Sequence, residues 1–197
     1  MSDTARIQPL EAPYPEPAAA YLARSMPAWS KMEPIVLFRT WARHMPMVDG
    51  LAGLGRYILA NGSLEERDRE VVIHRTTARL GAEYEWGVHA VGFAQRVGFD
   101  ADQLRASVSG RADDPAWTDR DRLLVRLVDE LVDTATVGEE LWTELAAEWS
   151  DEQLLELLMV AGFYHAVSFT VNALGLAREP WAASFADVGS KRTAGSR

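Results

Sequence analysis

A long uncharged segment near the C-terminus constrains the fold of this chain more than any other feature. Residues 157–177, 21 in all, contain no Asp, Glu, Lys or Arg. Ser150 and Gln153 have the spacing of a capping box before this segment, and Gly175 can end a helix. A helix that is apolar on all sides needs cover from other elements. The pattern predicts a long, buried central helix from about residue 150 to Leu174.

A membrane span is the alternative interpretation of this segment, since its length would suffice. However, His165, Ser168, Thr170 and Asn172 interrupt the apolar run, and the residues before it are acidic rather than basic. We therefore expect the core helix of a soluble oligomer that makes no contact with a membrane. The N-terminus lacks the charged and apolar regions of a secretory signal, so we expect a cytoplasmic location.

Helical spacing of apolar residues continues through most of the chain. Ser63 and Glu66 have the spacing of a second capping box, and Asp100 and Thr118 can cap further helices. No segment combines period-two alternation with hairpin turns. The sequence therefore predicts an all-α fold. The expected helices cover about residues 35–43, 48–59, 64–80, 83–97, 101–108, 119–131, 140–148 and 151–174.

Prolines and charge define the organisation around this helical core. The first 34 residues contain six prolines, which disfavour long helices and favour an extended arm with at most a short helical turn. We expect an arm over residues 1–34, one helical domain over 35–178, and a small, polar, flexible tail over 179–197. The net charge of −9 disfavours nucleic acid as a partner.

Two Glu–His pairs are the candidates for chemistry. Glu85 and His89 lie four residues apart, so a helix places them on one face. A carboxylate there can fix the imidazole tautomer and tune its pKa for acid–base catalysis, although an ordinary helical contact has the same spacing. Glu70 and His74 repeat the spacing on the preceding helix. A short turn near Gly81 would let the two pairs face one another.

Other polar residues could contact a substrate. Arg75 and Arg79 could hold a carboxylate, or could form a solvated arginine face. His165, Ser168 and Asn172 form a polar stripe in the apolar helix, which could line a pocket, a subunit contact or a hydrogen-bonded seam.

Composition excludes several kinds of site. The chain has no cysteine, so disulfides, thiolate metal sites and cysteine-based redox cycles are impossible. Glu70, His74, Glu85 and His89 could form a carboxylate–histidine metal site, but they lack the Glu-x-x-His spacing of di-iron bundles. We expect neither a metal nor another cofactor.

The order of motifs resembles the carboxymuconolactone decarboxylase and AhpD-like superfamily. The matching motifs span roughly residues 60 to 178 and fall on the expected helices. They are Arg67-Asp68-Arg69-Glu70, Tyr84-Glu85-Trp86-Gly87-Val88-His89 with Gly98, Asp129-Glu130-Leu131 with Trp142, and Gly162-Phe163-Tyr164-His165-Ala166-Val167-Ser168 with Asn172-Ala173. The resemblance implies an AhpD-like multi-helix bundle that forms a homo-oligomer.

The peroxidase branch of that superfamily places a Cys-x-x-Cys pair before the histidine, but Ala82 and Glu85 occupy those positions here. Thiol peroxidase activity is therefore excluded. The decarboxylase branch implies a cofactor-free lyase that removes carbon dioxide from a small carboxylated lactone and reprotonates the product. That resemblance makes His89 the proton donor, with Glu85 orienting it and Glu70 supporting it.

Tyr84 and Trp86 flank Glu85 and are further candidates for substrate contact. The alternative to an enzyme is a non-catalytic binding or assembly protein that has the same fold.

Overall fold

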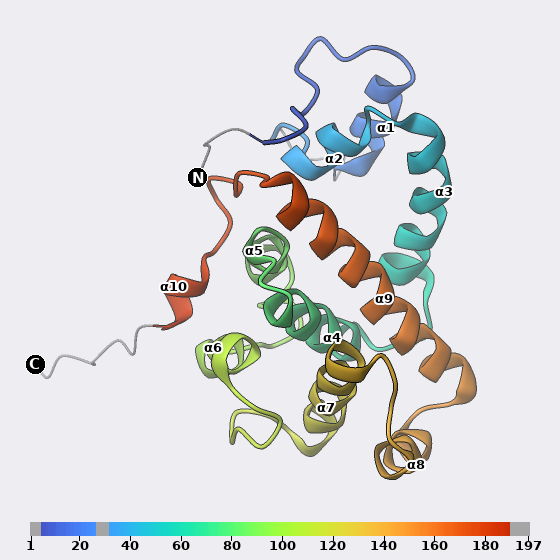
Figure 1. Ribbon diagram of the computed structural model, residues 1–197, viewed down its shortest axis with the longest axis vertical. Coiled ribbons are helices and arrows are strands. Elements are labelled where there is room, and N and C mark those ends of the chain that lie inside the picture. Colours follow the sequence, from blue (N-terminus) through green and yellow to red (C-terminus); the bar gives the residue numbers. More distant parts are fainter. Residues whose placement is uncertain (1–4, 27–31, 190–197) are drawn as a thin grey trace, which may run out of the picture.

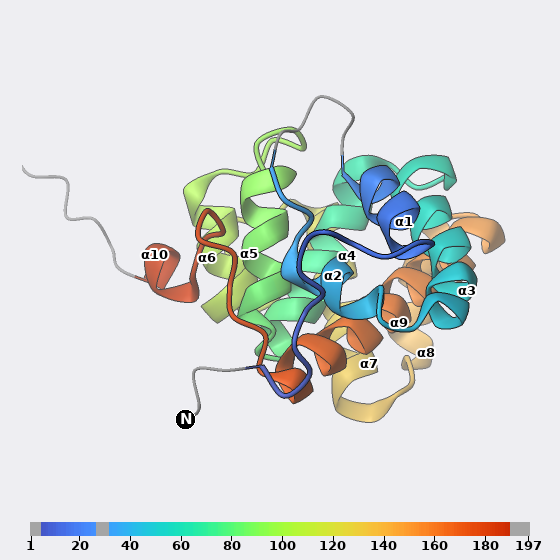
Figure 2. The same ribbon diagram turned by 90° about the horizontal axis from the view of Figure 1, so that it is seen from above.

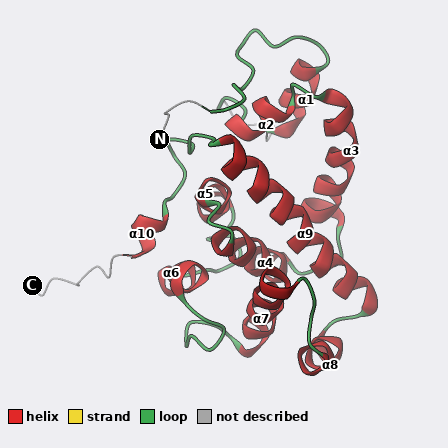
Figure 3. Ribbon diagram, in the orientation of Figure 1, coloured by secondary structure: helices red, strands yellow, loops and turns green. Residues whose placement is uncertain are grey.

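A computed structural model describes residues 5–26 and 32–189, and all regular secondary structure in these residues is helical (Figures 1 and 3). The all-α prediction is confirmed. In chain order the elements are α1 (Ala18–Ser25), α2 (Val36–Trp41), α3 (Met45–Arg56), a π-helical turn (Tyr57–Asn61), α4 (Glu66–Arg79), α5 (Glu83–Gly92), α6 (Ala101–Ser109), α7 (Asp119–Thr134), α8 (Glu139–Glu148), α9 (Asp151–Leu174) and α10 (Phe185–Gly189).

The long uncharged segment forms most of α9, which crosses the molecule diagonally in Figure 1. Ser150 and Gln153 form the expected capping box, and Gly175 ends the helix with φ at 61°. Within the described residues, α9 alone is long and apolar enough to span a membrane, and half of its most apolar window is buried in the protein. A core helix passes the same test, so this composition is weak evidence for a membrane span.

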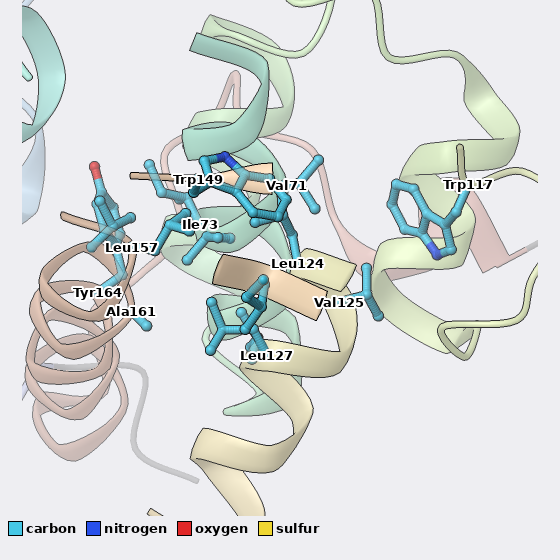
Figure 4. Packing of buried hydrophobic residues seen from close by; sticks show 14 of the residues in the cluster. Val71, Ile73, Trp117, Leu124, Val125, Leu127, Trp149, Leu157, Ala161 and Tyr164 are labelled. Atoms are coloured by element: carbon cyan, nitrogen blue, oxygen red, sulfur yellow. The ribbon is translucent and has the colours of Figure 1, made fainter. Parts of the chain in front are cut away.

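The central element of the fold is α4, which packs against α5, α6, α7 and α9. Every residue from Asp68 to Thr77 is buried, so the helix has no solvated face in this stretch. Its apolar residues join a core cluster with α7 and α9 (Figure 4). The labelled members from these three helices include Val71, Ile73, Leu124, Leu127, Leu157 and Ala161.

The predicted capping box of Ser63 and Glu66 is wrong. The N-cap of α4 is Glu65, and its side chain makes no capping hydrogen bond. Instead, the backbone N–H groups of Ser63 and Leu64 donate to the carboxylate of Glu156 on α9. This long-range contact provides acceptors for the backbone N–H groups of the turn before α4, so the helix begins later than the local pattern predicts.

The helix that carries His89 is shorter than predicted. We expected it to continue to about Val97, but α5 ends at Gly92. Glycine is a poor helix former, and the N–H group of Ala94 reaches back to the carbonyl of His89 in a wider turn. Gly98 follows with φ at 75°, which favours glycine.

The arm and the tail both pack on the helical body. The N–H group of Arg6 donates to the carbonyl of Leu174. We expected at most a short helical turn in the arm, but the eight-residue helix α1 follows Pro17, because it begins with a run of alanines, which favour helices. Seen from above, α1 and α3 lie on one side and α6 and α10 on the other (Figure 2). The tail residue Glu179 is buried. The expected flexibility of residues 190–197 lies outside the described residues.

Candidate active site

The site forms where α4 and α5 pack as an antiparallel pair. Gly81 adopts a left-handed conformation with φ at 63°, and the N–H group of Ala82 donates to the carbonyl of Thr77. This tight reversal places the start of α4 beside the end of α5. Glu70 and His89 therefore come into contact, although 19 positions separate them in the sequence.

His89 lies between two carboxylates. Its Nδ1 atom is 2.8 Å from Oε2 of Glu70, and its Nε2 atom is 3.5 Å from Oε1 of Glu85. All three side chains are buried. The contact with Glu70 is a hydrogen bond, whereas the contact with Glu85 is a longer ion pair. The structure thus brings together the three residues that the sequence singles out for catalysis.

The two carboxylates control the charge of the His89 imidazole. Burial by itself would lower the pKa of His89, but the charges of Glu70 and Glu85 outweigh burial and raise the pKa to about 9. Burial would raise the pKa of Glu70, yet the contact with His89 holds it below its ordinary value. At neutral pH the site therefore contains an imidazolium between two carboxylates.

His74 has the opposite protonation state. Its Nδ1 atom lies 2.8 Å from the backbone carbonyl of Glu70, so this nitrogen carries a proton and donates. Complete burial lowers the pKa of His74 to about 4, despite the opposing effect of Glu70. Its Nε2 atom is buried and makes no hydrogen bond within the described residues. His74 is thus a neutral residue behind the charged pair.

Two aromatic rings cover the imidazole of His89. The ring of Phe93 stacks on it with a centroid distance of 4.7 Å, and Tyr164 on α9 meets it edge-on at 5.1 Å. Burial and the nearby Glu85 and Glu70 raise the pKa of Tyr164 well above its ordinary value, so its hydroxyl stays protonated. The rings exclude water and strengthen the electrostatic contacts of the site.

The structure places Arg75 and Arg79 away from His89. Both guanidinium groups contact Asp129 on α7, and Arg75 does so with two hydrogen bonds of 2.7 and 2.8 Å. Arg79 also contacts Asp133 at 2.5 Å. Arg75 is buried rather than part of a solvated arginine face. These arginines connect α4 to α7, so their geometry favours a structural role over substrate binding.

Tyr84 and Trp86 are buried and engaged with other parts of the chain. The hydroxyl group of Tyr84 donates to Glu179 at 2.6 Å, and it accepts the N–H group of Leu37. The indole N–H of Trp86 donates to the hydroxyl of Ser107. Both side chains therefore hold neighbouring segments against α5.

The polar stripe of α9 also lies away from the pair. Ser168 is buried, and its hydroxyl donates to the carbonyl of Tyr164 one turn earlier. His165 is partly exposed and contacts the ring of Phe169. The amide of Asn172 donates to the carbonyl of Leu80. Of the three possibilities for this stripe, the structure shows a seam at Asn172 and a surface hollow at His165.

Arg69 is a site residue that we did not predict. It is buried, and its Nε atom lies 3.4 Å from Oε1 of Glu70. Its two terminal nitrogens make no hydrogen bond with the described residues, unlike those of Arg75. The sequence signal was the position next to Glu70, but this helix contains four arginines, and only the fold shows which of them lies at the site.

No group of three or more His, Asp or Glu side chains is arranged like metal ligands within residues 5–26 and 32–189. Glu70, His74, Glu85 and His89 form hydrogen bonds and ion pairs with one another instead. The absence of a metal and of any other cofactor stays a prediction. Hollows of about 630 and 250 Å³ lie on the surface, and none of these four residues lines either of them.

A pair of antiparallel helices with a buried acid–base cluster, covered by a long third helix, defines the class of this protein as an AhpD-like helical bundle. The family model of the carboxymuconolactone decarboxylase family matches residues 46–125, which is less than half of the chain. The matched region contains α4 and α5 with Glu70, Glu85 and His89. No curated protein matches the sequence.

Solved structures of several proteins resemble the whole fold. An uncharacterized peroxidase-related protein from Silicibacter sp. TM1040 has a TM-score of 0.77 at 16% identity, covering 94% of this chain and 99% of that one. An AhpD-core, peroxidase-related protein from Ralstonia eutropha JMP134 has a TM-score of 0.68 at 14% identity, covering 91% and 95%. The debrominase Bmp8, in a cysteine-to-alanine variant with 2,3,4-tribromopyrrole, has a TM-score of 0.69 at 17% identity, covering 92% and 95%.

At these identities the structural likeness concerns the fold alone. The family match over residues 46–125 and the AhpD-like fold agree with the resemblance to the carboxymuconolactone decarboxylase and AhpD-like superfamily. The resemblance inferred from the motifs is confirmed.

Proposed function

We propose that this protein is a cofactor-free lyase that removes carbon dioxide from a small carboxylated lactone or a related organic acid. The observation that carries the proposal is the buried imidazolium of His89 between Glu70 and Glu85. A positioned imidazolium is a suitable proton donor for a carbanion, which is the species that decarboxylation leaves behind.

The proposed reaction has two steps. The bond between the substrate carbon and its carboxylate breaks, the electron pair remains on the substrate as a delocalised enolate-like carbanion, and carbon dioxide leaves. His89 then donates a proton from Nε2 to that carbon, and solvent returns a proton to the imidazole. Glu70 holds Nδ1 throughout, which keeps the ring oriented.

Glu85 has a second role in this proposal. Its Oε1 atom faces His89, whereas its Oε2 atom is buried without a hydrogen-bond partner in the described residues. An unpaired buried carboxylate oxygen is costly, so a donor on the substrate would gain from pairing with it. We assign Glu85 to substrate orientation and to proton return.

Arg69 is the residue that we assign to the substrate carboxylate. Its Nε atom contacts Glu70, and its two terminal nitrogens make no hydrogen bond with the described residues. An arginine binds a carboxylate through paired N–H donors. Arg75 and Arg79 already contact aspartates of α7, so Arg69 replaces them in the proposed mechanism.

Access to His89 requires a movement of its aromatic cover. Phe93 follows the end of α5, stacks on the imidazole and is itself partly exposed. Rotation of this ring would open a path from solvent to the pair. Closure over a bound acid would again exclude water from the site.

The comparisons support the proposal in part. The family model that covers α4 and α5 is that of a decarboxylase family. Bmp8, on a similar fold, was crystallised with a small brominated ring compound. Because this chain has no cysteine, we propose acid–base rather than thiol chemistry for it.

A non-catalytic binding or assembly role is the second candidate. The observation that favours it is the packing at His89, where protein side chains contact both ring nitrogens and two aromatic rings cover the imidazole. In this alternative the charged pair would only connect α4 to α5.

Turnover of a panel of carboxylated lactones and organic acids, including carboxymuconolactone, separates the two candidates. We expect carbon dioxide release by the wild type, and a loss of about 100-fold or more in His89→Gln. In heavy water the product should gain one deuterium at the decarboxylated carbon. His44→Asn is the matched control, because His44 is an exposed N-cap and asparagine keeps the cap. If the wild type turns over none of these compounds, the non-catalytic role is favoured.

A further inference from the structure

One face of α9 is exposed and apolar. Leu155, Met159 and Phe169 expose 65%, 52% and 62% of their surface. The only charged residue between Leu155 and Ala177 is Glu156, which is buried and accepts the hydroxyl of Tyr57. We call this face the α9 stripe; its members are Leu155, Met159, Gly162, Ala166, Phe169 and Ala173, all of them exposed.

The spacing of the α9 stripe is that of a helix–helix seam. Its positions are separated alternately by four and three residues, which is the repeat of a coiled coil. The two central positions are Gly162 and Ala166, so a second helix could approach closely there. Larger side chains stand on both sides of this centre, at Met159 and Phe169.

We propose that the α9 stripe joins two copies of this chain in an antiparallel, two-fold symmetric dimer. With the symmetry axis between the central positions, Gly162 lies opposite the partner's Ala166, and Met159 lies opposite the partner's Phe169. Each contact occurs twice, as a two-fold interface requires. The two inner pairs therefore place large residues against large ones and small residues against small ones, while Leu155 lies opposite the partner's Ala173.

A hollow beside the stripe fits this arrangement. It has a volume of about 250 Å³ and lies between α4, α7 and α9, with Leu158, Gly162 and His165 on its α9 side. In the antiparallel dimer the partner's Phe169 packs between Met159 and Gly162, at the edge of this hollow. The buried hydroxyl of Thr76, which also lines the hollow, makes no hydrogen bond within the described residues. The hollow thus has room for an aromatic ring of the second copy.

The charges at the two ends of α9 and the exposed apolar area of the stripe are consistent with a second copy of the chain as its partner. Asp151 and Glu152 are exposed in the first turn of α9, and the exposed Arg178 follows its C-terminal end. An antiparallel pair sets the acidic end of each helix against the basic end of the other, with opposed helix dipoles. At roughly 200 Å² for a large apolar side chain, Leu155, Met159 and Phe169 together expose on the order of 350 Å². The two copies would bury twice this area, a large part of the roughly 1,200 Å² of a small stable interface.

Sedimentation equilibrium of the full chain tests the proposal. We expect a dimer for the wild type at tens of micromolar, and a monomer with unchanged helical circular dichroism for Met159→Glu and Phe169→Glu. Val91→Glu is the matched control, because Val91 is 51% exposed on α5, and this variant should remain dimeric. A monomeric wild type, or a dimer that persists in both α9 variants, would overturn the proposal. Binding of the wild type to phosphatidylcholine vesicles in place of dimerisation would also overturn it.

Disulfide cross-linking tests the orientation without introducing charge. The chain has no cysteine, so a single engineered thiol can form a disulfide only with another molecule. G162C and A166C should each give little covalent dimer when oxidised alone, whereas an equimolar mixture should give at least several-fold more. Equal cross-linking by the single variants would indicate a parallel pair and contradict the proposed symmetry. This experiment does not depend on enzymatic activity.

Discussion

The Nδ1 atom of His89 lies 2.8 Å from Oε2 of Glu70, closer than its Nε2 atom lies to Glu85. The residue four positions away on the same helix is therefore the weaker partner. The stronger partner comes from α4, across the antiparallel turn. The charge of His89 therefore depends on how α4 packs against α5.

Glu70→Gln should lower the pKa of His89 from about 9 by at least one unit, because the amide removes the closer of two negative charges. Glu85→Gln should lower it less. Titration of the histidine side chains by NMR measures both effects. Glu66→Gln, on the same helix but away from His89, should leave the pKa unchanged; an unchanged value in Glu70→Gln would contradict our account of the site.

Protein stability should fall at alkaline pH. The pKa of His89 is about 9 in the folded protein and near 6.5 when unfolded, so its contribution is complete below pH 6.5 and is lost as pH rises through 9. The loss in the free energy of unfolding is about 3 kcal/mol. Urea unfolding between pH 6 and 10 measures it. His89→Gln should remove most of this slope, and an equal slope in the variant would count against the charged pair.

Asp129→Ala should destabilise the protein by about 3 kcal/mol, because it leaves the buried Arg75 without its ion-pair partner. Asp133→Ala removes only the exposed partner of Arg79 and should cost less than about 1 kcal/mol. Thermal or urea unfolding of both variants tests the structural role of these arginines. Similar small losses in both would return Arg75 to the candidates for substrate binding.

Arg69→Lys should raise KM for an acid substrate about tenfold or more, with a smaller effect on kcat, since lysine cannot make the paired contact with a carboxylate. The melting temperature should change little. Arg96→Lys is the surface control, because Arg96 is exposed. Equal KM values in wild type and Arg69→Lys would remove Arg69 from the proposed binding site.

Elemental analysis of protein purified without chelators should detect no stoichiometric zinc, iron or manganese. The physical reason is that Glu70 and Glu85 pair with a protonated His89, which cannot serve as a metal ligand. Stoichiometric metal that is lost together with activity would contradict the cofactor-free mechanism.

Local patterns predicted the helices with strong caps. Thr118 caps α7 and the capping box before α9 forms, both as expected, and Gly175 ends α9. Prediction failed where a distant contact overrides the local pattern, as when Glu156 binds the backbone at Ser63. The ion pair of Arg75 could not be predicted for a related reason, because Asp129 is 54 positions away from it in the sequence.

The sequence by itself determined the all-α class, the long apolar helix, the absence of thiol chemistry and the same-face spacing of Glu85 and His89. These follow from composition and from the helical repeat, which act over a few residues. Only the tertiary structure decided that Glu70 is the closer partner of His89 and that Arg69 contacts Glu70, whereas Arg75 pairs with Asp129. Burial and pairing between helices set these properties, and both depend on which distant side chains pack together.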